Sequence, residues 1–326
     1  MVTKKEVAEY AGVSTATVSR VINGVGYISS ETERKVRKAI EELNYIPNKL
    51  AGNLARNKSN LIAVLVEDLI NPYYMALVDA MVERASAENY VVAVFAIKNR
   101  DVRHVLADLA ANRVCGIVNL AMFTCDFSCY DIFTEAGTKL INCTADSSMV
   151  MINYRSGMEE AMSYLRDNGH KNVAFISGLE EWLTYKDARV KYFIDNRSRF
   201  GFSEDTAVLS ADYPMSKAYD VGYALAGELI DSGKKTDAVI CLTDMMALGA
   251  TKAFFDRGYS VPNDVSFIGC DDLEFTEYFN PALTTISVDK RAEGFAYIDY
   301  ILGKTSEVTE ISTHLKVRES VKNISE

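Results

Sequence analysis

The stretch Val13 to Gly24, VSTATVSRVING, decides how the amino-terminal part of the chain folds. Ser14 can accept a hydrogen bond from the free amides of a first helical turn, and Asn23-Gly24 suits the left-handed conformation that ends a helix. Between these ends, apolar residues at helical spacing predict one buried stripe: Val18, Val21 and Ile22. The opposite face is small, hydroxylated and cationic and carries no acid: Thr15, Ala16, Thr17, Ser19 and Arg20.

An acid-free helical face of this kind fits the floor of a DNA major groove. Short side chains let the helix axis come close, hydroxyls can meet phosphates or base edges, and the Arg20 guanidinium can fork onto a guanine edge. The alternative is a surface helix that lacks carboxylates by chance. A helix-turn-helix also needs a partner helix and a tight turn, so the flanking sequence decides between the two.

The partner helix and the turn lie immediately upstream. Thr3 and Glu6 form a T-x-x-E capping box, and Gly12 is placed to end the helix that they begin. A third helix is expected from Ser30, where Ser30 and Glu33 form a second capping box. Three such helices can bury one small core, so residues 1–46 are predicted to be an all-α helix-turn-helix DNA-binding domain.

Residues 47–58 are predicted to be a hinge. Pro47 ends the third helix and allows a new helix to start at Asn48, but Gly52 costs that short helix about 1 kcal/mol relative to alanine. A helix this short is marginal in water. Our hypothesis is that the hinge is mostly unfolded in the free protein and becomes helical only on DNA.

Charge is unevenly distributed along the 326 residues. The net charge is −10, yet residues 1–60 hold ten Lys and Arg against six Glu, which is +4 and leaves −14 for the remainder. Because residues 1–60 are basic and the remainder is acidic, we expect any contact with a polyanion to be made by residues 1–60. The remainder, residues 59–326, is long enough for two lobes.

The six cysteines lie mostly in apolar runs without C-x-x-C pairs, and the three histidines are far apart. We therefore expect reduced thiols and neither a metal site nor a cofactor. No apolar leader precedes the charged start, and no apolar run reaches the roughly 18 residues of a membrane span. The expected location is the cytoplasm, with no membrane partner.

The body alternates apolar runs with amphipathic stretches, which predicts an α/β fold with parallel sheets and crossover helices. The division into lobes is expected near residue 155, with a return of the chain near 283–290. The expected strands are 61–67, 91–97, 115–121, 139–143, 172–178, 237–242 and 265–269, and the expected helices include 72–88, 154–168, 215–231 and 245–257.

Ligands of open parallel sheets bind beyond the carboxyl ends of the strands. Tyr73 and Tyr74 follow the first expected strand and could face a sugar ring or a base, although either could simply pack in the core. Arg189 can donate paired hydrogen bonds, and Asp271 can accept from hydroxyls. In Thr243-Asp244 the aspartate could be a helix cap or a ligand contact. Together these residues predict a polyol-binding cleft.

The headpiece and hinge resemble a known family. V-A-x-x-A-G-V-S-x-x-T-V-S-R-V-I-N-G begins at Val7 and Y-x-P-N-x-x-A-x-x-L begins at Tyr45, as in the lactose/galactose repressor (LacI/GalR) family. The resemblance implies that Thr15, Ala16 and Arg20 face base edges while Ser14, Thr17 and Asn23 steady the DNA backbone. It also implies that Leu54 wedges into the minor groove. Gly52 departs from the long residue that is usual there.

The body resembles the same family, through VPNDVSFIGCDD (261–272) and NPALTTI (280–286). This implies a two-lobed, periplasmic-binding-protein-like effector core. The effector contacts that it implies are Tyr73, Tyr74, Arg189, Tyr213, Thr243 and Asp271. The sequence departs from the family at Thr243, where many sugar-responsive members have Asn, at Asn153, which replaces Asp, and at Tyr192, which replaces the Gly of R-x-x-G-F.

The predicted function is a sequence-specific DNA-binding transcriptional regulator, a repressor by expectation, controlled by a carbohydrate-like effector between the lobes. A homodimer is expected, because a two-fold protein matches a pseudo-palindromic operator in double-stranded DNA; higher assembly is left open. One alternative is a solute receptor, which explains the body but not the headpiece. An enzyme is the other, but no G-x-S-x-G, P-loop or G-x-G-x-x-G follows a strand, and His170 is expected in a turn.

Overall fold

The computed structural model describes residues 2–23, 25–45, 59–98, 100–121, 127–143, 149–211 and 217–325. The predicted hinge with Leu54, the helix-ending Gly24 and the predicted effector contact Tyr213 lie outside these ranges. The chain divides into two compact units, Met1–Ser59 and Asn60–Glu326, which we call the headpiece and the core unit.

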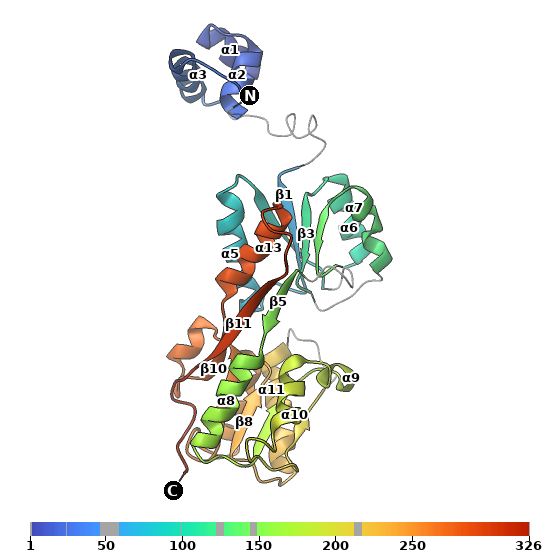
Figure 1. Cartoon of the computed structure of the whole chain (residues 1–326), viewed down its shortest axis with the longest axis vertical. Coiled ribbons are helices and arrows are strands. Elements are labelled where there is room, and N and C mark those ends of the chain that lie inside the picture. The colour runs from blue at the N-terminus through green and yellow to red at the C-terminus, as the bar shows by residue number, and fades with distance from the viewer. Residues whose placement is uncertain are drawn as a thin grey trace. The chain divides into compact units, whose positions relative to one another are not determined.

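The headpiece contains the three predicted helices, α1 (Lys4–Ala11), α2 (Thr15–Asn23) and α3 (Ser30–Glu42) (Figure 1). The capping box of α1 is confirmed: Thr3 Oγ1 accepts from the Glu6 amide at 3.3 Å, and the Glu6 carboxylate accepts from the Thr3 amide at 2.6 Å. Gly12 ends α1 in the left-handed conformation, with φ 66°. Ser14 Oγ accepts from the amide of Thr17 at 3.1 Å, which confirms its role at the start of α2.

The predicted capping box of α3 is wrong by one residue. Ser29, with extended backbone angles, is the N-cap and accepts from the Thr32 amide at 3.3 Å, so Ser30 is already helical. Because the cap lies one position earlier, Glu33 is free to accept from Arg37 at 2.6 Å, one turn further along. The buried core of the headpiece is Val7, Ala8, Val18, Val21, Val36, Ala39 and Tyr45.

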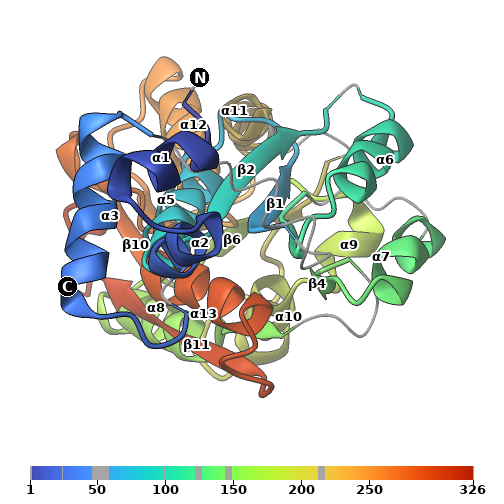
Figure 2. The same ribbon diagram turned by 90° about the horizontal axis from the view of Figure 1, so that it is seen from above.

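The first lobe of the core unit is built on a parallel sheet of order β2-β1-β3-β4. In Figure 2 helices α5 and α13 lie on one side of these strands and α6 and α7 on the other. Each face of the sheet has its own apolar core. The elements are β1 (Leu61–Val66), α5 (Pro72–Ser86), β2 (Val91–Ala96), α6 (Val102–Ala111), β3 (Gly116–Asn119), η1 (Phe127–Tyr130), α7 (Asp131–Glu135), β4 (Lys139–Ile141) and α13 (Lys290–Ile301).

The second lobe is built on a sheet of order β5-β11-β10-β9-β8-β6-β7. Its strands are β5 (Val150–Asn153), β6 (Val173–Ile176), β7 (Val208–Leu209), β8 (Ala238–Cys241), β9 (Ser266–Asp271), β10 (Thr284–Val288) and β11 (Thr309–Lys316). Its helices are α8 (Arg155–Asp167), α9 (Glu181–Thr184), α10 (Ala188–Asn196), α11 (Ala218–Asp231), α12 (Asp244–Asp256) and η3 (Glu274–Tyr278).

All seven predicted strands are present and lie in parallel sheets, as predicted, and the second lobe adds one antiparallel pairing. The chain leaves that lobe after β10, forms α13 on the first lobe and comes back as β11. Strand β11 pairs antiparallel with β10 and parallel with β5, because a chain that goes out and returns reverses its direction. Figure 1 shows β5 and β11 running side by side between the two lobes.

Two tyrosines contact the apolar cores of both lobes. Tyr73, in the first turn of α5, and Tyr154, just before α8, pack against the core of the second lobe and against the α5 side of the first. The lobes are therefore joined by packed aromatic rings as well as by the crossing strands. None of the described helices is long and apolar enough to cross a membrane.

Helices α11 and α12 touch backbone to backbone at two glycines. A Cβ at Gly249 would lie 2.0 Å from the Tyr219 carbonyl oxygen, and one at Gly222 would lie 2.1 Å from the Met246 carbonyl oxygen. Neither helix can accept a side chain there without moving away from the other.

We therefore expect Gly249→Ala to destabilise the core unit by about 1–3 kcal/mol through overpacking. Urea unfolding followed by fluorescence reports this unit alone, since Trp182 is the one tryptophan of the chain. The matched control is Gly227→Ala in α11, where a Cβ meets only the end of the Arg257 side chain. It should be neutral or stabilising, because alanine favours a helix by about 1 kcal/mol. Equal midpoints for the two variants would contradict this packing account.

Candidate DNA-contact face and effector site

The outer face of α2 is as the sequence predicts. Val18 and Val21 are buried, while Ser14, Thr15, Ala16 and Arg20 are exposed and Thr17 is partly exposed. The hydroxyls of Ser14 and Thr17 share a hydrogen bond of 2.9 Å, which fixes the start of the helix. Asn23 is the last residue of α2. The short side chains and Arg20 thus point outward from a helix whose capping and packing hold it in place.

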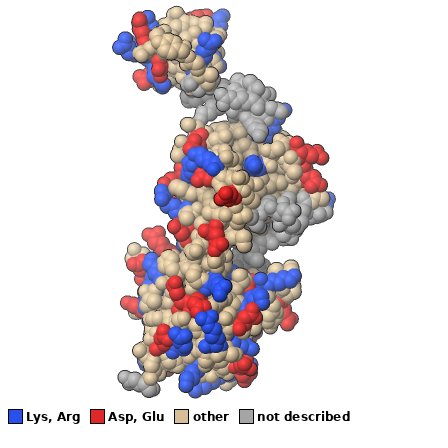
Figure 3. Space-filling model, in the orientation of Figure 1, with Lys and Arg blue, Asp and Glu red and all other residues tan. Residues whose placement is uncertain are grey.

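The Arg20 side chain is exposed and has no hydrogen-bond or ion-pair partner among the described residues. On α3 three of the four cations are paired with acids one turn away: Lys35 with Glu31 at 2.8 Å, Arg37 with Glu33 at 2.6 Å and Lys38 with Glu42 at 3.7 Å. Figure 3 shows the resulting mixture of blue and red on the headpiece. The Arg20 guanidinium therefore remains available to a ligand, whereas most of the charges on α3 are paired within the helix.

Two further groups beside this face were missed by the sequence reasoning. Lys4 Nζ donates to Ser19 Oγ at 3.4 Å and brings a second cation to α2. Tyr27, in the loop after α2, is 97% exposed, with Val25 57% exposed next to it. The loop carries no periodicity, so only the structure shows that this aromatic ring is available.

In the core unit, Arg189 lies at the start of α10. Asp187 caps that helix and accepts from Arg189 Nε at 3.0 Å and from Nη2 at 2.8 Å. Nη1 donates to the carbonyl of Leu242 at 3.0 Å, and the guanidinium lies 4.5 Å from the centre of the Tyr154 ring. Burial alone would raise the pKa of Asp187, but Arg189 holds it below its usual value. This guanidinium is anchored on the protein, with its remaining edge left for a ligand.

Asp271 ends β9 and is buried, with a φ of 126°, and Asp272 follows at 52°. Residues other than glycine rarely adopt a positive φ, and each of these two aspartates stores backbone strain of about 1–3 kcal/mol. Lys290, in the first turn of α13, donates to the carbonyls of both and to that of Val288. Burial and the neighbouring Asp244 raise the pKa of Asp271 well above its ordinary value. The strained strand end is thus held from the first lobe by a lysine.

Asp244 is neither the helix cap nor the ligand contact that the sequence offers as alternatives. Thr243 is the N-cap of α12 and accepts from the Met246 amide at 3.2 Å. Asp244 is fully buried and accepts from the Leu273 amide at 2.8 Å and from Thr285 Oγ1 at 2.6 Å. It therefore ties β8, β9 and β10 together behind the strand ends.

Burial raises the pKa of Asp244 from 3.8 to about 6, although the bonds from Thr285 and Leu273 lower it. A carboxyl with a higher pKa in the folded chain stabilises the fold most below its unfolded pKa, and this contribution is lost as the pH rises through the folded value. We expect the stability of the core unit to fall between pH 4 and 6 and to fall less steeply in Asp244→Asn. Urea midpoints across that range would show it; an unchanged slope would rule out Asp244 as the source.

The two tyrosines after β1 have different environments. Tyr73 donates its hydroxyl to Glu293 at 2.6 Å, and Glu293 also accepts from Tyr297 at 2.8 Å. Tyr74 packs edge-to-face on Tyr73, with ring centres 6.0 Å and planes 72° apart, and has no hydrogen bond to the described residues. Burial, then Asp271 and Glu67, raise the pKa of Tyr74 to about 12. Tyr73 is therefore held inside the protein, whereas Tyr74 keeps its hydroxyl for a ligand.

The structure brings most of the predicted effector residues together. Tyr74 feels the charges of Asp271 and Arg189 on the second lobe, and Arg189 bonds to Leu242, the neighbour of Thr243. The sequence reasoning missed three groups at this site: Glu67, Tyr154 and Lys290. Glu67 comes directly after β1 and would have been found by applying the strand-end rule to the last residue of the run 61–67.

Comparison with known proteins decides the family. The lacI family of bacterial regulatory proteins matches residues 3–48, and a periplasmic binding protein-like domain matches residues 162–321. The chain is 31% identical to the HTH-type transcriptional repressor PurR of Histophilus somni (strain 129Pt), over 99% of this chain and 100% of that protein. The chain belongs to the LacI family of bacterial regulatory proteins.

Solved structures agree with this membership of the LacI family. The lac repressor dimer bound to operator and the anti-inducer ONPF matches with a TM-score of 0.80 and 27% identity, over 98% of this chain and 99% of that one. The transcriptional regulator CelR in complex with cellobiose matches with a TM-score of 0.67 and 27% identity, over 98% and 100%. The predictions of an α/β two-lobed core and of a regulator rather than an enzyme are confirmed, and the receptor alternative gains no support.

Proposed function

We propose that this protein is a cytoplasmic repressor that binds a pseudo-palindromic operator as a homodimer and responds to a small polyhydroxylated effector. The observation that carries the DNA part is that Arg20, on the acid-free outer face of α2, is exposed and has no partner among the described residues, whereas three of the four cations of α3 are paired with acids. In this proposal Thr15, Ala16 and Arg20 face base edges, Ser14, Thr17 and Asn23 meet the DNA backbone, and Leu54 of the hinge enters the minor groove.

The effector is proposed to bind between the lobes of the core unit. Tyr74, Arg189, Thr243 and Asp271 would contact it, together with Tyr213, and Tyr73 would hold Tyr74 in place through its bond to Glu293. Two relatives support a small ligand: one is described in complex with cellobiose and another with an anti-inducer on operator DNA. Lys290 of the first lobe holds the strained end of β9. A ligand bound at Asp271 can therefore change the position of one lobe relative to the other.

The homodimer follows from the symmetry of such operators, since a two-fold protein matches a two-fold site. The lac repressor in the operator complex is also described as a dimer. Effector and operator would then be coupled reciprocally, typically by about 1–3 kcal/mol.

Fluorescence anisotropy with a duplex from the region upstream of the gene tests the DNA part. We expect tight binding to a palindrome in that region, much weaker binding to a scrambled duplex, and a steep loss of affinity with salt. Equal affinity for both duplexes would refute a sequence-specific regulator.

A further inference from the structure

The end of β9 is held by the side chain of Asp272, which is not among the proposed effector contacts. Its carboxylate accepts from Arg318 Nη2 at 2.6 Å, from Ser287 Oγ at 2.9 Å and from Lys316 Nζ at 3.4 Å. Its amide donates to Thr285 Oγ1 at 3.3 Å. Burial alone would raise the pKa of Asp272, but Arg318 and Ser287 hold it below its usual value. Asp272 is therefore a charged anchor between β9, β10 and the segment that follows β11.

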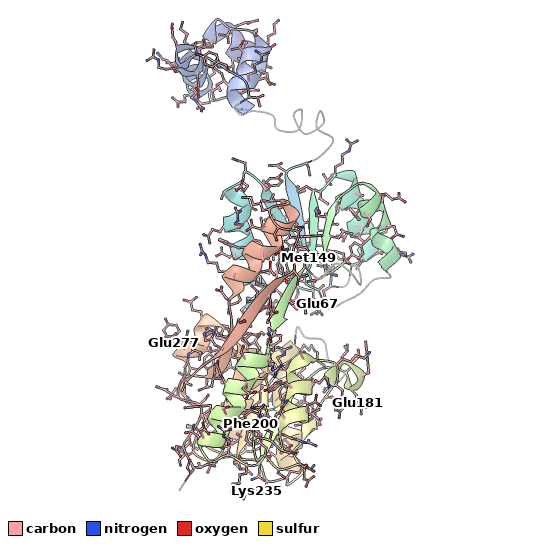
Figure 4. The ribbon with its side chains drawn as sticks, viewed as in Figure 1. Glu67, Met149, Glu181, Phe200, Lys235 and Glu277 are labelled. Carbon is pink, nitrogen blue, oxygen red and sulfur yellow. The ribbon has the colours of Figure 1, made fainter. Side chains whose placement is uncertain are left out.

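Arg318 makes the shortest of these contacts, and the second lobe holds it in place. It lies two residues after β11, and its side chain is only 7% exposed. Nη1 donates to the Leu283 carbonyl at 2.7 Å and to Thr276 Oγ1 at 3.4 Å. Glu277 of η3, at the edge of the second lobe in Figure 4, is exposed and lies 3.9 Å from Nη2. The guanidinium therefore reaches Asp272 from a fixed position.

Asp271 and Asp272 need such support because both have positive φ values, 126° and 52°. A residue other than glycine stays in this region only where the surrounding contacts hold it there. Lys290 holds the two carbonyls, and Arg318 holds the Asp272 side chain. Without Arg318, Asp272 would keep one ion-pair partner among the described residues, Lys316, whose side chain is 46% exposed. An exposed pair of this kind contributes little, so the turn would relax.

The same turn borders an arginine of the proposed effector site. Arg189 Nη1 lies 3.8 Å from the sulfur of Cys270, the residue before Asp271. A change in the turn would therefore move the Asp271 carboxylate relative to Arg189. Resting on the proposed effector site, we propose that Arg318 is a positioning residue, which through Asp272 holds the conformation in which Asp271 meets the effector.

The test uses the full-length protein and a panel of polyhydroxylated compounds: glucose, galactose, ribose, cellobiose, mannitol and adenosine. The compound that stabilises the wild type most in a thermal-shift screen is the probe, and its Kd is measured by calorimetry at a temperature at which the variants are folded. We expect Arg318→Met to bind it at least about tenfold more weakly, because a turn that forms in about a tenth of the molecules raises the apparent Kd tenfold.

The matched control is Arg84→Met. The Arg84 side chain is also largely buried, at 15% exposed, and pairs with Asp299 at 2.5 Å, but this pair joins α5 to α13 on the first lobe. Its loss should lower the Tm, as in Arg318→Met, and leave the Kd for the probe unchanged.

Two double variants separate positioning from the cost of burying an unpaired carboxylate. Arg318→Met with Asp272→Gly and Arg318→Met with Asp272→Ala both remove that carboxylate, so both should regain stability relative to Arg318→Met alone. Glycine adopts a positive φ at no steric cost, whereas alanine does not. We therefore expect the glycine variant to recover most of the lost affinity and the alanine variant to remain weak.

A wild-type Kd in Arg318→Met, or equal Kd values in the two double variants, overturns the positioning role and leaves the proposed effector site standing. If Arg318→Met does not fold, the two double variants decide alone. If no compound of the panel binds the wild type while operator binding is intact, the proposed polyhydroxylated effector fails, and the inference fails with it.

Discussion

Replacing Arg20 with alanine is expected to remove most of the discrimination between operator and scrambled duplex. The guanidinium is exposed and unpartnered among the described residues, so the substitution costs no internal contact that the structure shows. Loss of one bidentate contact to a base pair is worth about 1–3 kcal/mol, which is roughly a 5- to 150-fold weaker operator complex. Anisotropy titrations with both duplexes at one salt concentration measure the ratio.

The matched control for Arg20→Ala is Arg37→Ala. Arg37 is also an exposed arginine of the headpiece, but it is bound to Glu33 at 2.6 Å on α3. Its removal should change the affinity for the two duplexes by similar, small factors, because an exposed ion pair is worth about 0–1 kcal/mol. If Arg20→Ala keeps the wild-type ratio of affinities while its headpiece remains folded, α2 does not read the operator through this residue.

Replacing Arg189 with alanine is expected to destabilise the core unit as well as to remove the effector response. The substitution leaves Asp187 largely buried without its cation, frees the Leu242 carbonyl and removes the group stacked on Tyr154. Breaking a buried pair by removing one partner costs about 3–5 kcal/mol. Urea unfolding followed by Trp182 fluorescence should show this as a lower midpoint.

A double variant separates the two effects of Arg189. In Arg189→Ala with Asp187→Ala, no unpaired carboxylate remains, so part of the lost stability should return while the effector response stays absent. Arg189→Lys keeps a charge but not the forked contact to Asp187 and should also lose the response. A stable Arg189→Ala protein that still responds to effector would remove this residue from both the fold and the site.

The strands that the sequence predicts are those that read as continuous apolar runs, because they are buried on both faces of parallel sheets. It misses four strands, β5, β7, β10 and β11, and two of them have a different pattern. Strand β7 has two residues, and β11, TEISTHLK, buries only Ile311 and Thr313 in alternation. Its antiparallel place beside β10 depends on α13 carrying the chain to the first lobe and back, which no local pattern encodes.

Site residues could be predicted where a local rule applied, and their partners could not. Asp271 was found because it ends an apolar run, and Ser14 because it precedes a helix. That Tyr73 is held by Glu293, 220 residues away, and Asp244 by Thr285, 41 residues away, follows only from the packing of distant segments. For the same reason the sequence leaves Asp244 as either a helix cap or a ligand contact, whereas in the structure it is a buried acceptor for Leu273 and Thr285.

Reciprocal coupling between effector and operator tests the central claim most directly. The claim is that the α2 face binds the operator while a metabolite between the lobes of the core unit sets its affinity. A sugar that binds is first found by its stabilisation of the protein in a thermal-shift screen. The Kd for operator is then measured with and without a saturating concentration of that sugar, and the Kd for the sugar is measured with and without saturating operator. The account predicts that both change by the same factor, about 5- to 150-fold. A sugar that stabilises the core unit but leaves the operator Kd unchanged would contradict it.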